Sequence, residues 1–93
     1  MVPYERFEAW QRCHELTRAI YLATATWPRS EIYGLVAQAR RAAASAATNI
    51  AEGSAKRGRR EFRRYLDIAL GTLSELSYLL RLARDLGFLS ELE

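Results

Sequence analysis

The stretch from Gly34 to Ala51 limits what this chain can fold into more than any other part of it. Nothing in the stretch breaks a helix, and eight of its eighteen residues are alanine, the strongest helix former. The segment is therefore predicted to be helical in any context. Gly53 is predicted to end the helix.

A helical wheel of this segment separates its faces. One stripe is polar and consists of Gln38, Arg41, Ser45, Thr48, Asn49 and Glu52. The stripe beside it suits an internal core and consists of Leu35, Ala39, Ala42, Ala46 and Ile50. Most of the remaining circumference is also small and apolar, whereas a surface helix normally carries charge opposite its core face. The helix is therefore expected to have neighbours on more than one side, which indicates self-association in addition to an internal core.

A long helix is predicted before this segment, from Glu5 to Trp27, because apolar residues recur there at alternating spacings of four and three. Pro28 ends that helix, and Ser30 is a candidate N-cap for the alanine-rich one. The recurring positions are Ala9, Cys13, Leu16, Ile20, Ala23 and Trp27. Their spacing is typical of the seam of an antiparallel helical bundle.

A third long helix is predicted from Arg59 to Leu86, with Gly58 and Glu61 at the positions of a capping box and Gly87 just past the end. One of its apolar seams suits the internal core: Phe62, Leu66, Ala69, Leu73, Leu76, Leu80 and Ala83. A second seam on another face is the predicted interface with another subunit or a partner: Ile68, Leu79, Leu82 and Leu86. The chain is thus predicted to be one all-α domain over residues 1–93, an oligomeric antiparallel up-down bundle of three long helices.

Residues around the alanine-rich helix also carry a resemblance to a known family. They are Trp27, Pro28, Glu31, Tyr33, Gly34, Leu35, Gln38, Arg40, Arg41, Ala42, Ser45, Asn49, Ile50, Ala51, Glu52 and Gly53, followed by Glu61, Phe62, Tyr65, Leu66, Ile68, Ala69, Gly71, Leu73, Glu75 and Leu76. The most specific piece is Ser45-x-x-x-Asn49-Ile50-Ala51-Glu52-Gly53. In these residues the chain resembles the four-helix-bundle family of ribosomal RNA intervening-sequence proteins, which includes the accessory variability determinant of diversity-generating retroelements.

This resemblance implies a small helical bundle that assembles into a ring-like homo-oligomer, a pentamer, and it implies no defined reaction. The retroelement branch is associated with binding RNA or DNA and with a reverse transcriptase as partner. The sequence departs from the family after Gly87, where a fourth helix would begin and where Ser90 could cap it. The fourth helix is therefore expected to be short or missing, which leaves one groove of the bundle uncovered. Either subunit contacts close the leftover apolar surface, as we expect, or the chain is a truncated and less stable form.

Positive charge is concentrated in one short segment. The chain has a net charge of +3, but the six basic residues between positions 56 and 64, with Glu61 as the only acid among them, give that segment +5. The predicted nucleic-acid-binding residues are Lys56, Arg57, Arg59, Arg60, Arg63 and Arg64. A solvated turn is the alternative, but cations in the first turn of a helix are electrostatically disfavoured, which indicates another purpose. Few aromatic residues interleave with these cations, so binding should read the phosphate backbone rather than the base sequence.

Other candidate residues are more easily explained by structure than by chemistry. A line of polar residues on an apolar helix usually fixes the register between helices or forms hydrogen bonds with buried polar groups. A ligand site is the less common alternative. The line in this chain is Gln38, Arg41, Ser45, Asn49 and Glu52. The single histidine, His14, is expected to be packed or interfacial, and Cys13 on the core seam is expected to be buried. The paired Glu-x-x-His motifs of di-metal bundles are missing from the sequence, as are phosphate loops and hydrolase motifs. We expect no metal, no cofactor and no enzymatic activity.

Two functions are compatible with this sequence. The first is a scaffold that binds nucleic acid through a basic rim. A cytoplasmic location without a membrane role is expected for it, because the chain has a lone cysteine and lacks a leader or a long uncharged span. The second is a protein-interaction module that recruits a partner helix through exposed apolar seams and has no nucleic-acid role. In the second case Leu79, Leu82 and Leu86 would be the sensitive positions.

Overall fold

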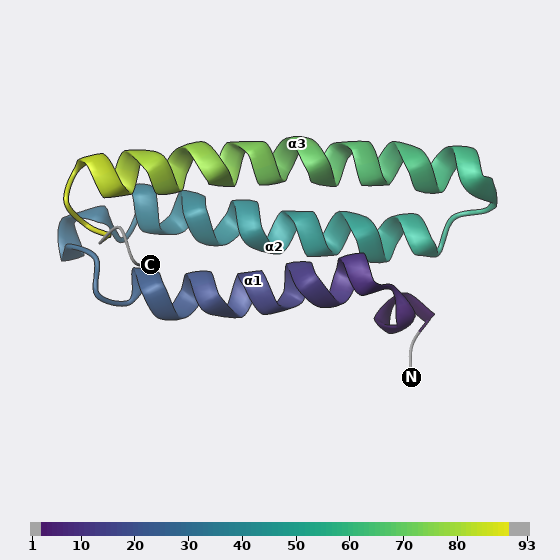
Figure 1. The fold of residues 1–93 in the computed structure, drawn as a ribbon, viewed down its shortest axis with the longest axis horizontal. Helices are drawn as coiled ribbons and strands as arrows, with labels where there is room; N and C mark the ends of the chain where they lie inside the picture. The colour runs from purple at the N-terminus through teal and green to yellow at the C-terminus, as the bar shows by residue number, and fades with distance from the viewer. Residues whose placement is uncertain (1–2, 90–93) are drawn as a thin grey trace.

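Three antiparallel α-helices make up most of the chain in a computed structural model, which describes residues 3–89. Helix α1 spans Glu8–Thr24, α2 spans Leu35–Ser54 and α3 spans Gly58–Asp85, while the 3-10 turns η1 (Pro3–Arg6) and η2 (Arg29–Glu31) precede α1 and α2. Figure 1 shows the helices side by side along a body of 44 × 24 × 24 Å. The described residues form only helices and turns, which confirms the predicted all-α bundle of three long helices. None of these helices combines the length and the apolar character needed to cross a membrane.

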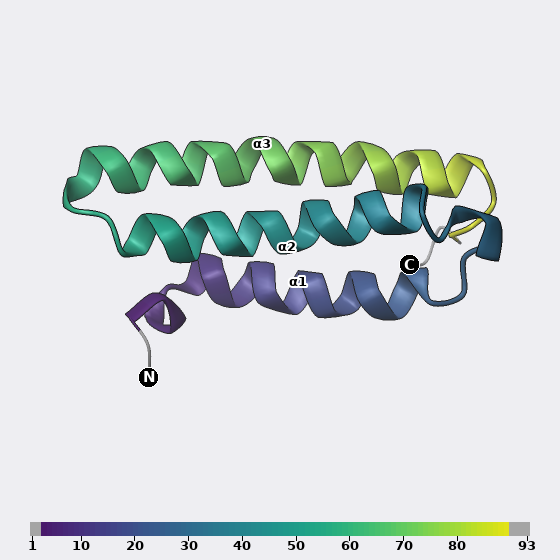
Figure 2. The same cartoon turned by 180° about the vertical axis from the view of Figure 1, so that it is seen from behind.

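Helix α2 lies at the centre of the bundle. Figures 1 and 2 show it between α1 and α3 from both sides, and no described Cα atom of α1 lies within 8 Å of one in α3. The predicted core stripe of α2 is buried throughout, and four further residues of the helix are buried with it: Val36, Ala43, Ala47 and Gly53. Both neighbours can approach α2 closely because so many of its side chains are small. Much of the apolar surface of α2 is therefore covered by α1 and α3 of the same chain. The apolar character of α2 thus does not by itself indicate self-association.

The ends of α1 differ from the prediction of one helix from Glu5 to Trp27. Phe7 has an extended backbone, with φ −78° and ψ 124°, and separates η1 from α1. At the other end the helix stops at Thr24, and it could not have included Trp27, because the residue before a proline is sterically disfavoured in the α conformation. Trp27 is buried instead, with its ring 6.0 Å from the ring of Phe88 beyond α3.

Helix α2 also differs from the prediction at both ends. Ser30 lies inside η2 and does not cap α2; the carboxylate of Glu31 accepts a hydrogen bond from the backbone N–H of Leu35 at 3.0 Å. Gly53 does not end the helix, which continues to Ser54. Gly53 is buried against α3, and a Cβ atom added to it would lie 2.6 Å from the Cβ of Tyr65 and 3.0 Å from Cδ1 of Phe62. Gly53 therefore allows the last turns of α2 to approach the first turns of α3.

Polar contacts fix α1 against α2. The Arg40 guanidinium donates through Nε to Thr24 Oγ1 at 2.9 Å and through Nη2 to the carbonyl of Tyr21 at 3.2 Å, and it lies 4.6 Å from the centre of the Tyr21 ring. Thr24 is buried, and its hydroxyl donates to the carbonyl of Ile20 at 2.7 Å. Arg40 thus binds one carbonyl and one hydroxyl in the last turn of α1, where a cation is favoured by the helix dipole.

The end of α3 agrees with the prediction. Gly87 has φ +82°, a left-handed conformation that favours glycine, and the N–H of Phe88 donates to the carbonyl of Ala83 at 2.8 Å. The reversed chain brings Phe88 and Leu89 back toward α1, where both pack against the core. The predicted cap at Ser90 lies outside the described residues.

Two glycine substitutions test the close approach at the α2–α3 junction. Gly53→Ala should lower the free energy of unfolding by about 1–2 kcal/mol, because overpacking costs about 1–3 kcal/mol and the gain in helix propensity returns up to about 1 kcal/mol. Gly71→Ala is the matched control, since nothing lies within 4 Å of a Cβ at that exposed position of α3. It should raise the free energy of unfolding by about 0.5–1 kcal/mol. Urea unfolding followed by circular dichroism measures both changes, and equal effects would contradict the close contact.

Candidate nucleic-acid interface

Six basic side chains gather at the end of the bundle where α2 connects to α3. We call this group the basic turn: Lys56, Arg57, Arg59, Arg60, Arg63 and Arg64. All six are exposed. Gly58 lies between them with φ +82°, so the chain can reverse direction and α3 can begin directly after Arg57. The structure therefore brings all of the predicted basic residues together at one end of the molecule.

The aromatic ring of Tyr65 orients two of these cations. Lys56 Nζ lies 5.8 Å and the Arg64 guanidinium carbon 5.2 Å from the centre of this ring. Arg64 also forms the one ion pair of the group, at 3.4 Å from Glu61. Because Gly53 packs on the same tyrosine, the end of α2 helps to fix the ring that orients these cations.

The other members of the basic turn keep their charge uncompensated. Within residues 3–89, none of the five cations other than Arg64 forms an ion pair. The predicted capping box is wrong: Gly58 is the first residue of the helix, Arg57 occupies the N-cap position, and no side chain caps the helix end there. Arg59 and Arg60 thus lie in the first turn, where the partial positive charge of the helix end opposes them. The arrangement costs helix stability and leaves positive charge facing solvent.

The predicted polar stripe lies on the open face of α2. Gln38, Arg41 and Glu52 are exposed, while Ser45 and Asn49 are half-buried. Asn49 Nδ2 lies 2.8 Å from the carbonyl of Ser45 and 3.2 Å from its hydroxyl oxygen, so its hydrogen bonds stay within the helix. The stripe satisfies no buried partner on α1 or α3 in the described part of the chain. The predicted role of this stripe in fixing the register between helices stays a prediction, and it would apply to contacts between subunits.

The predicted apolar interface is divided by the fold. Ile68 and Leu86 are 42% and 54% exposed, so both are available for contact. Leu79 is only 6% exposed and belongs to the core cluster, and Leu82 packs against that cluster. The prediction of an exposed Leu79 is therefore wrong, because α2 approaches this side of α3 closely enough to cover it.

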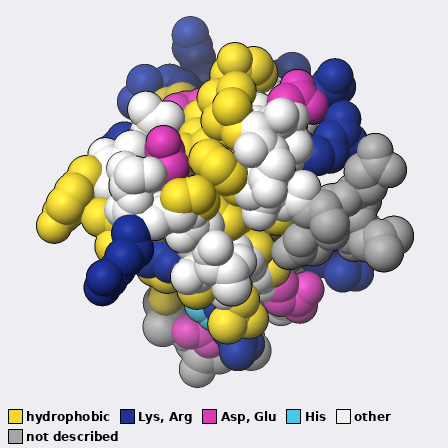
Figure 3. Space-filling view, turned by 90° about the vertical axis from the view of Figure 1, so that its left-hand side faces the viewer, with side chains coloured by type: hydrophobic (Ala, Val, Ile, Leu, Met, Phe, Trp, Pro, Cys, Tyr) yellow, Lys and Arg dark blue, Asp and Glu magenta, His cyan; other side chains and the backbone are white. Residues whose placement is uncertain are grey.

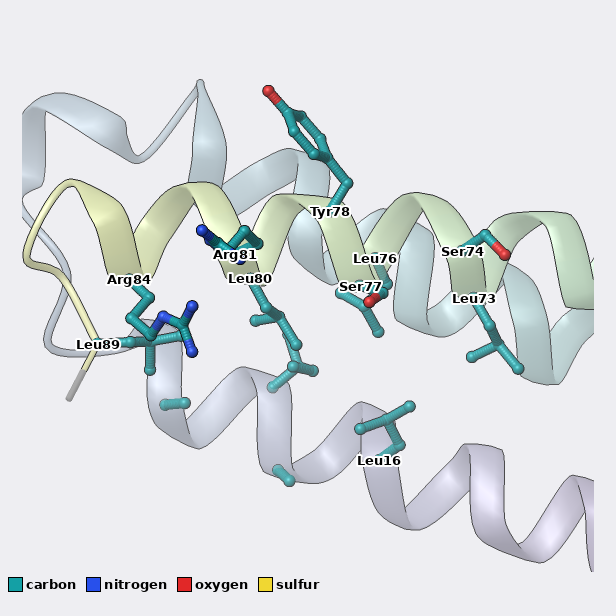
Figure 4. Close-up of a pocket in the computed structure, with 13 residues that line it drawn as sticks. Leu16, Leu73, Ser74, Leu76, Ser77, Tyr78, Leu80, Arg81, Arg84 and Leu89 are labelled. Carbon is teal, nitrogen blue, oxygen red and sulfur yellow. The ribbon is translucent and has the colours of Figure 1, made fainter. Parts of the chain in front are cut away.

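An apolar groove lies between α1 and α3, as expected for a bundle with an uncovered side. It has a volume of about 950 Å³. Figure 4 shows leucines from both helices projecting into it, with Arg81 and Arg84 at one end. The leucines that line it are Leu16 in α1, Leu73, Leu76 and Leu80 in α3, and Leu89 beyond the end of α3. Leu73 and Leu80, which the sequence placed on a core seam, are half-buried: both pack against the core and also line the groove.

The end of the bundle opposite the basic turn has a different surface. Figure 3 looks onto this end, formed by η2 and the C-terminal part of α3, and shows apolar side chains gathered between charged ones. The exposed apolar residues next to these segments are Ile32 and Tyr33, directly after η2, and Leu86, directly after α3. The elongated molecule therefore carries positive charge at one end and apolar surface at the other.

Cys13 and His14 lie next to each other in α1 but in different environments. Cys13 is buried, as predicted, and burial raises the pKa of its thiol above the usual value. His14 is exposed, with its ring stacked on that of Trp10 at 4.9 Å. Within residues 3–89 no three side chains of the His, Cys, Asp or Glu type gather closely enough to hold a metal ion.

The fold and the basic turn define a class of protein: a small all-α bundle with its positive charge concentrated at one end. The family described as 23S rRNA-intervening sequence protein matches residues 5–93, which is nearly the whole chain. The chain belongs to this family. This confirms the ribosomal RNA intervening-sequence part of the resemblance. A search of curated proteins finds no match.

The burial of Cys13 gives a test of the α1–α2 packing. A thiol-specific reagent at mildly alkaline pH should modify Cys13 at least tenfold more slowly in the folded protein than in urea, because burial shields the thiol and its raised pKa reduces the reactive thiolate. Absorbance of the released thiolate reporter measures the rate. Equal rates in both states would contradict the burial.

Proposed function

We propose that the chain is a cytoplasmic, non-catalytic, oligomeric scaffold that binds nucleic acid through the basic turn. The observation that carries the proposal is the gathering of six exposed cations at one end, with Glu61 as the only acid between them. Arginine can contact two oxygens of a phosphate at once, which suits a surface dominated by guanidinium groups. Membership of a family named for a ribosomal RNA intervening sequence also supports a role near nucleic acid.

The proposed contact is with the phosphate backbone. Tyr65 and Phe62 are the aromatic residues nearest in sequence to the basic turn; Tyr65 is half-buried beneath Lys56 and Arg64, and the Phe62 ring packs on that of Phe7 at 5.1 Å. Neither ring is free to stack with a base. The basic turn would therefore supply affinity that depends on charge and salt and little discrimination between sequences.

Assembly would multiply this charge. The apolar residues still exposed on the single chain support contacts between copies, and among them are Leu22, Ile68, Leu70, Tyr78 and Leu86. A ring-like pentamer, as the family resemblance implies, would present five basic turns and bind one nucleic acid at several points. The resemblance to the retroelement accessory protein adds a reverse transcriptase as a proposed partner.

Neutralising the free arginines tests the proposal. The triple variant Arg59→Gln, Arg60→Gln and Arg63→Gln should reduce the slope of log affinity against log salt by about 2, since each phosphate contact contributes about 0.7 to the slope on a single strand. Fluorescence anisotropy with a labelled single-stranded oligonucleotide, measured over a salt series, gives the slope.

The matched control neutralises three exposed arginines away from the basic turn: Arg18, Arg29 and Arg84. Its salt slope should equal that of the unmodified protein. The basic-turn variant should melt no lower than the unmodified protein, because it removes cations from a helix N-terminus. Binding that is absent in the unmodified protein, or insensitive to salt, rules the proposal out.

The groove between α1 and α3 favours a second candidate, a module that binds a partner helix. Its lining is mostly apolar with Arg81 and Arg84 at one end, and none of the described residues that line it is acidic. Arg81 pairs with Asp85 at 3.1 Å, whereas Arg84 forms no ion pair with a described residue. The occupant that fits is an amphipathic helix with leucine-like residues on one face and carboxylates near the end that meets Arg84.

A designed helical peptide tests this second candidate. The double variant Leu73→Gln and Leu80→Gln should weaken binding of a leucine-seamed peptide with glutamate flanks at least tenfold, because both leucines would face its apolar side. The control Ile68→Gln changes an exposed apolar residue that does not line the groove. Isothermal titration calorimetry measures the affinities. A peptide with lysine flanks that binds equally well would contradict the proposed charge pairing.

A further inference from the structure

A second cavity lies between the first part of α1 and the last turns of α2. It has a volume of about 360 Å³, near the lower end of the roughly 300–1,000 Å³ range of small-molecule pockets. One wall is aromatic and consists of Tyr4, Trp10 and His14. The wall contributed by α2 includes the small side chains of Ala47 and Ala51, which leave the space open. The cavity therefore has the size and the lining to take a single planar ring.

The aromatic wall is built from two elements. The ring of Tyr4, in η1, meets the ring of Trp10 edge-on at 4.8 Å, and His14 stacks on Trp10 with an interplanar angle of 8°. The side chain of Gln11 donates to the carbonyl of Glu5 at 2.7 Å and holds η1 against α1. These contacts fix the aromatic surface before any ligand arrives, so little side-chain entropy is lost on binding.

Glu52, an acidic residue, is among the residues that line this cavity. It forms no ion pair within residues 3–89. An ionised carboxylate only accepts hydrogen bonds, and it repels the phosphates that the basic turn would attract. A ligand that tolerates Glu52 must therefore present hydrogen-bond donors to it.

The cavity lies at the same end of the bundle as the basic turn. Glu52 is four residues before Lys56 at the end of α2. Phe7, which joins η1 to α1, has its ring 5.1 Å from that of Phe62, a residue between Arg59 and Arg63 in α3. Figure 1 shows η1 and the α2–α3 connection at the same end. A strand bound by its phosphates on the basic turn thus has the cavity near it.

We propose that this cavity holds one unpaired guanine base of a single-stranded nucleic acid whose phosphates lie on the basic turn, an inference that rests on the proposed function. The aromatic wall supplies a stacking surface, which by itself accepts any base. Glu52 would determine which of the bases binds. Guanine alone among the four common bases presents two adjacent N–H groups on its Watson–Crick edge, and these match the two oxygens of one carboxylate.

Four oligonucleotides of equal length and equal phosphate number test this inference. They are uridine throughout, except that the central position is uridine, guanosine, adenosine or an abasic site. The unmodified protein should bind the guanosine form about fivefold to a hundredfold more tightly than the uridine form, the range that base stacking and a charged hydrogen bond give. All four should show the same salt slope, because their phosphates are identical.

Glu52→Ala should remove the preference for guanosine, because both acceptor oxygens are lost, and should leave affinity for the uridine form the same or slightly higher, since one repulsive charge is lost. The matched control is Glu75→Ala, at an exposed acid on α3 that does not line the cavity. A Trp27→Phe background leaves Trp10 as the only tryptophan, so guanosine should change its fluorescence; Trp27 Nε1 has no described hydrogen-bond partner to lose.

The outcomes separate the two proposals. Salt-dependent binding with no preference for guanosine, or with an equal preference for adenosine, overturns the guanine site and leaves the basic turn in place. A guanosine preference that survives Glu52→Ala also overturns it. Absence of binding to all four oligonucleotides overturns both proposals together.

Discussion

The small side chains of α2 are the constraint on which the rest of the structure depends. Alanine at most contact positions lets α1 and α3 pack on two sides of α2, and buried Gly53 extends this close approach to the junction with α3. A central helix with large side chains would hold its neighbours further apart. Because α2 separates α1 from α3, the bundle has an open side, and the groove between the two outer helices follows from this arrangement.

The basic turn shows how the packing of α2 also shapes the candidate site. The contact of Gly53 with Tyr65 fixes the ring on which Lys56 and Arg64 lie, and Gly58 directs the chain into α3 immediately afterwards. The remaining arginines therefore start a helix whose dipole opposes them. Arginines in these positions lower the stability of the helix, and a bound anion would compensate for that loss. This is the argument for an anion-binding surface over a merely solvated turn.

The two cavities differ in the interactions they offer. The groove between α1 and α3 is long and apolar, which suits a helix, whereas the cavity between α1 and α2 is small and combines stacked aromatic rings with one carboxylate. This second site could not be predicted from the sequence, since Tyr4, Trp10 and Glu52 come from three elements. Only the fold places them together, and Glu52 was assigned to a polar stripe because a helical wheel cannot show which neighbour a side chain faces.

The sequence by itself determined the three helices, the buried stripe of α2, the burial of Cys13 and the clustering of the six cations, because periodicity, helix propensity and spacing along the chain are local properties. The tertiary structure decided what depends on a neighbour. It buried Leu79, exposed Leu73 and Leu80 to a groove, and kept Gly53 inside a helix that a glycine often ends. Those outcomes depend on how closely α1 and α3 approach α2. The separation between two helices depends on residues from both of them, so the pattern of a single segment cannot predict it.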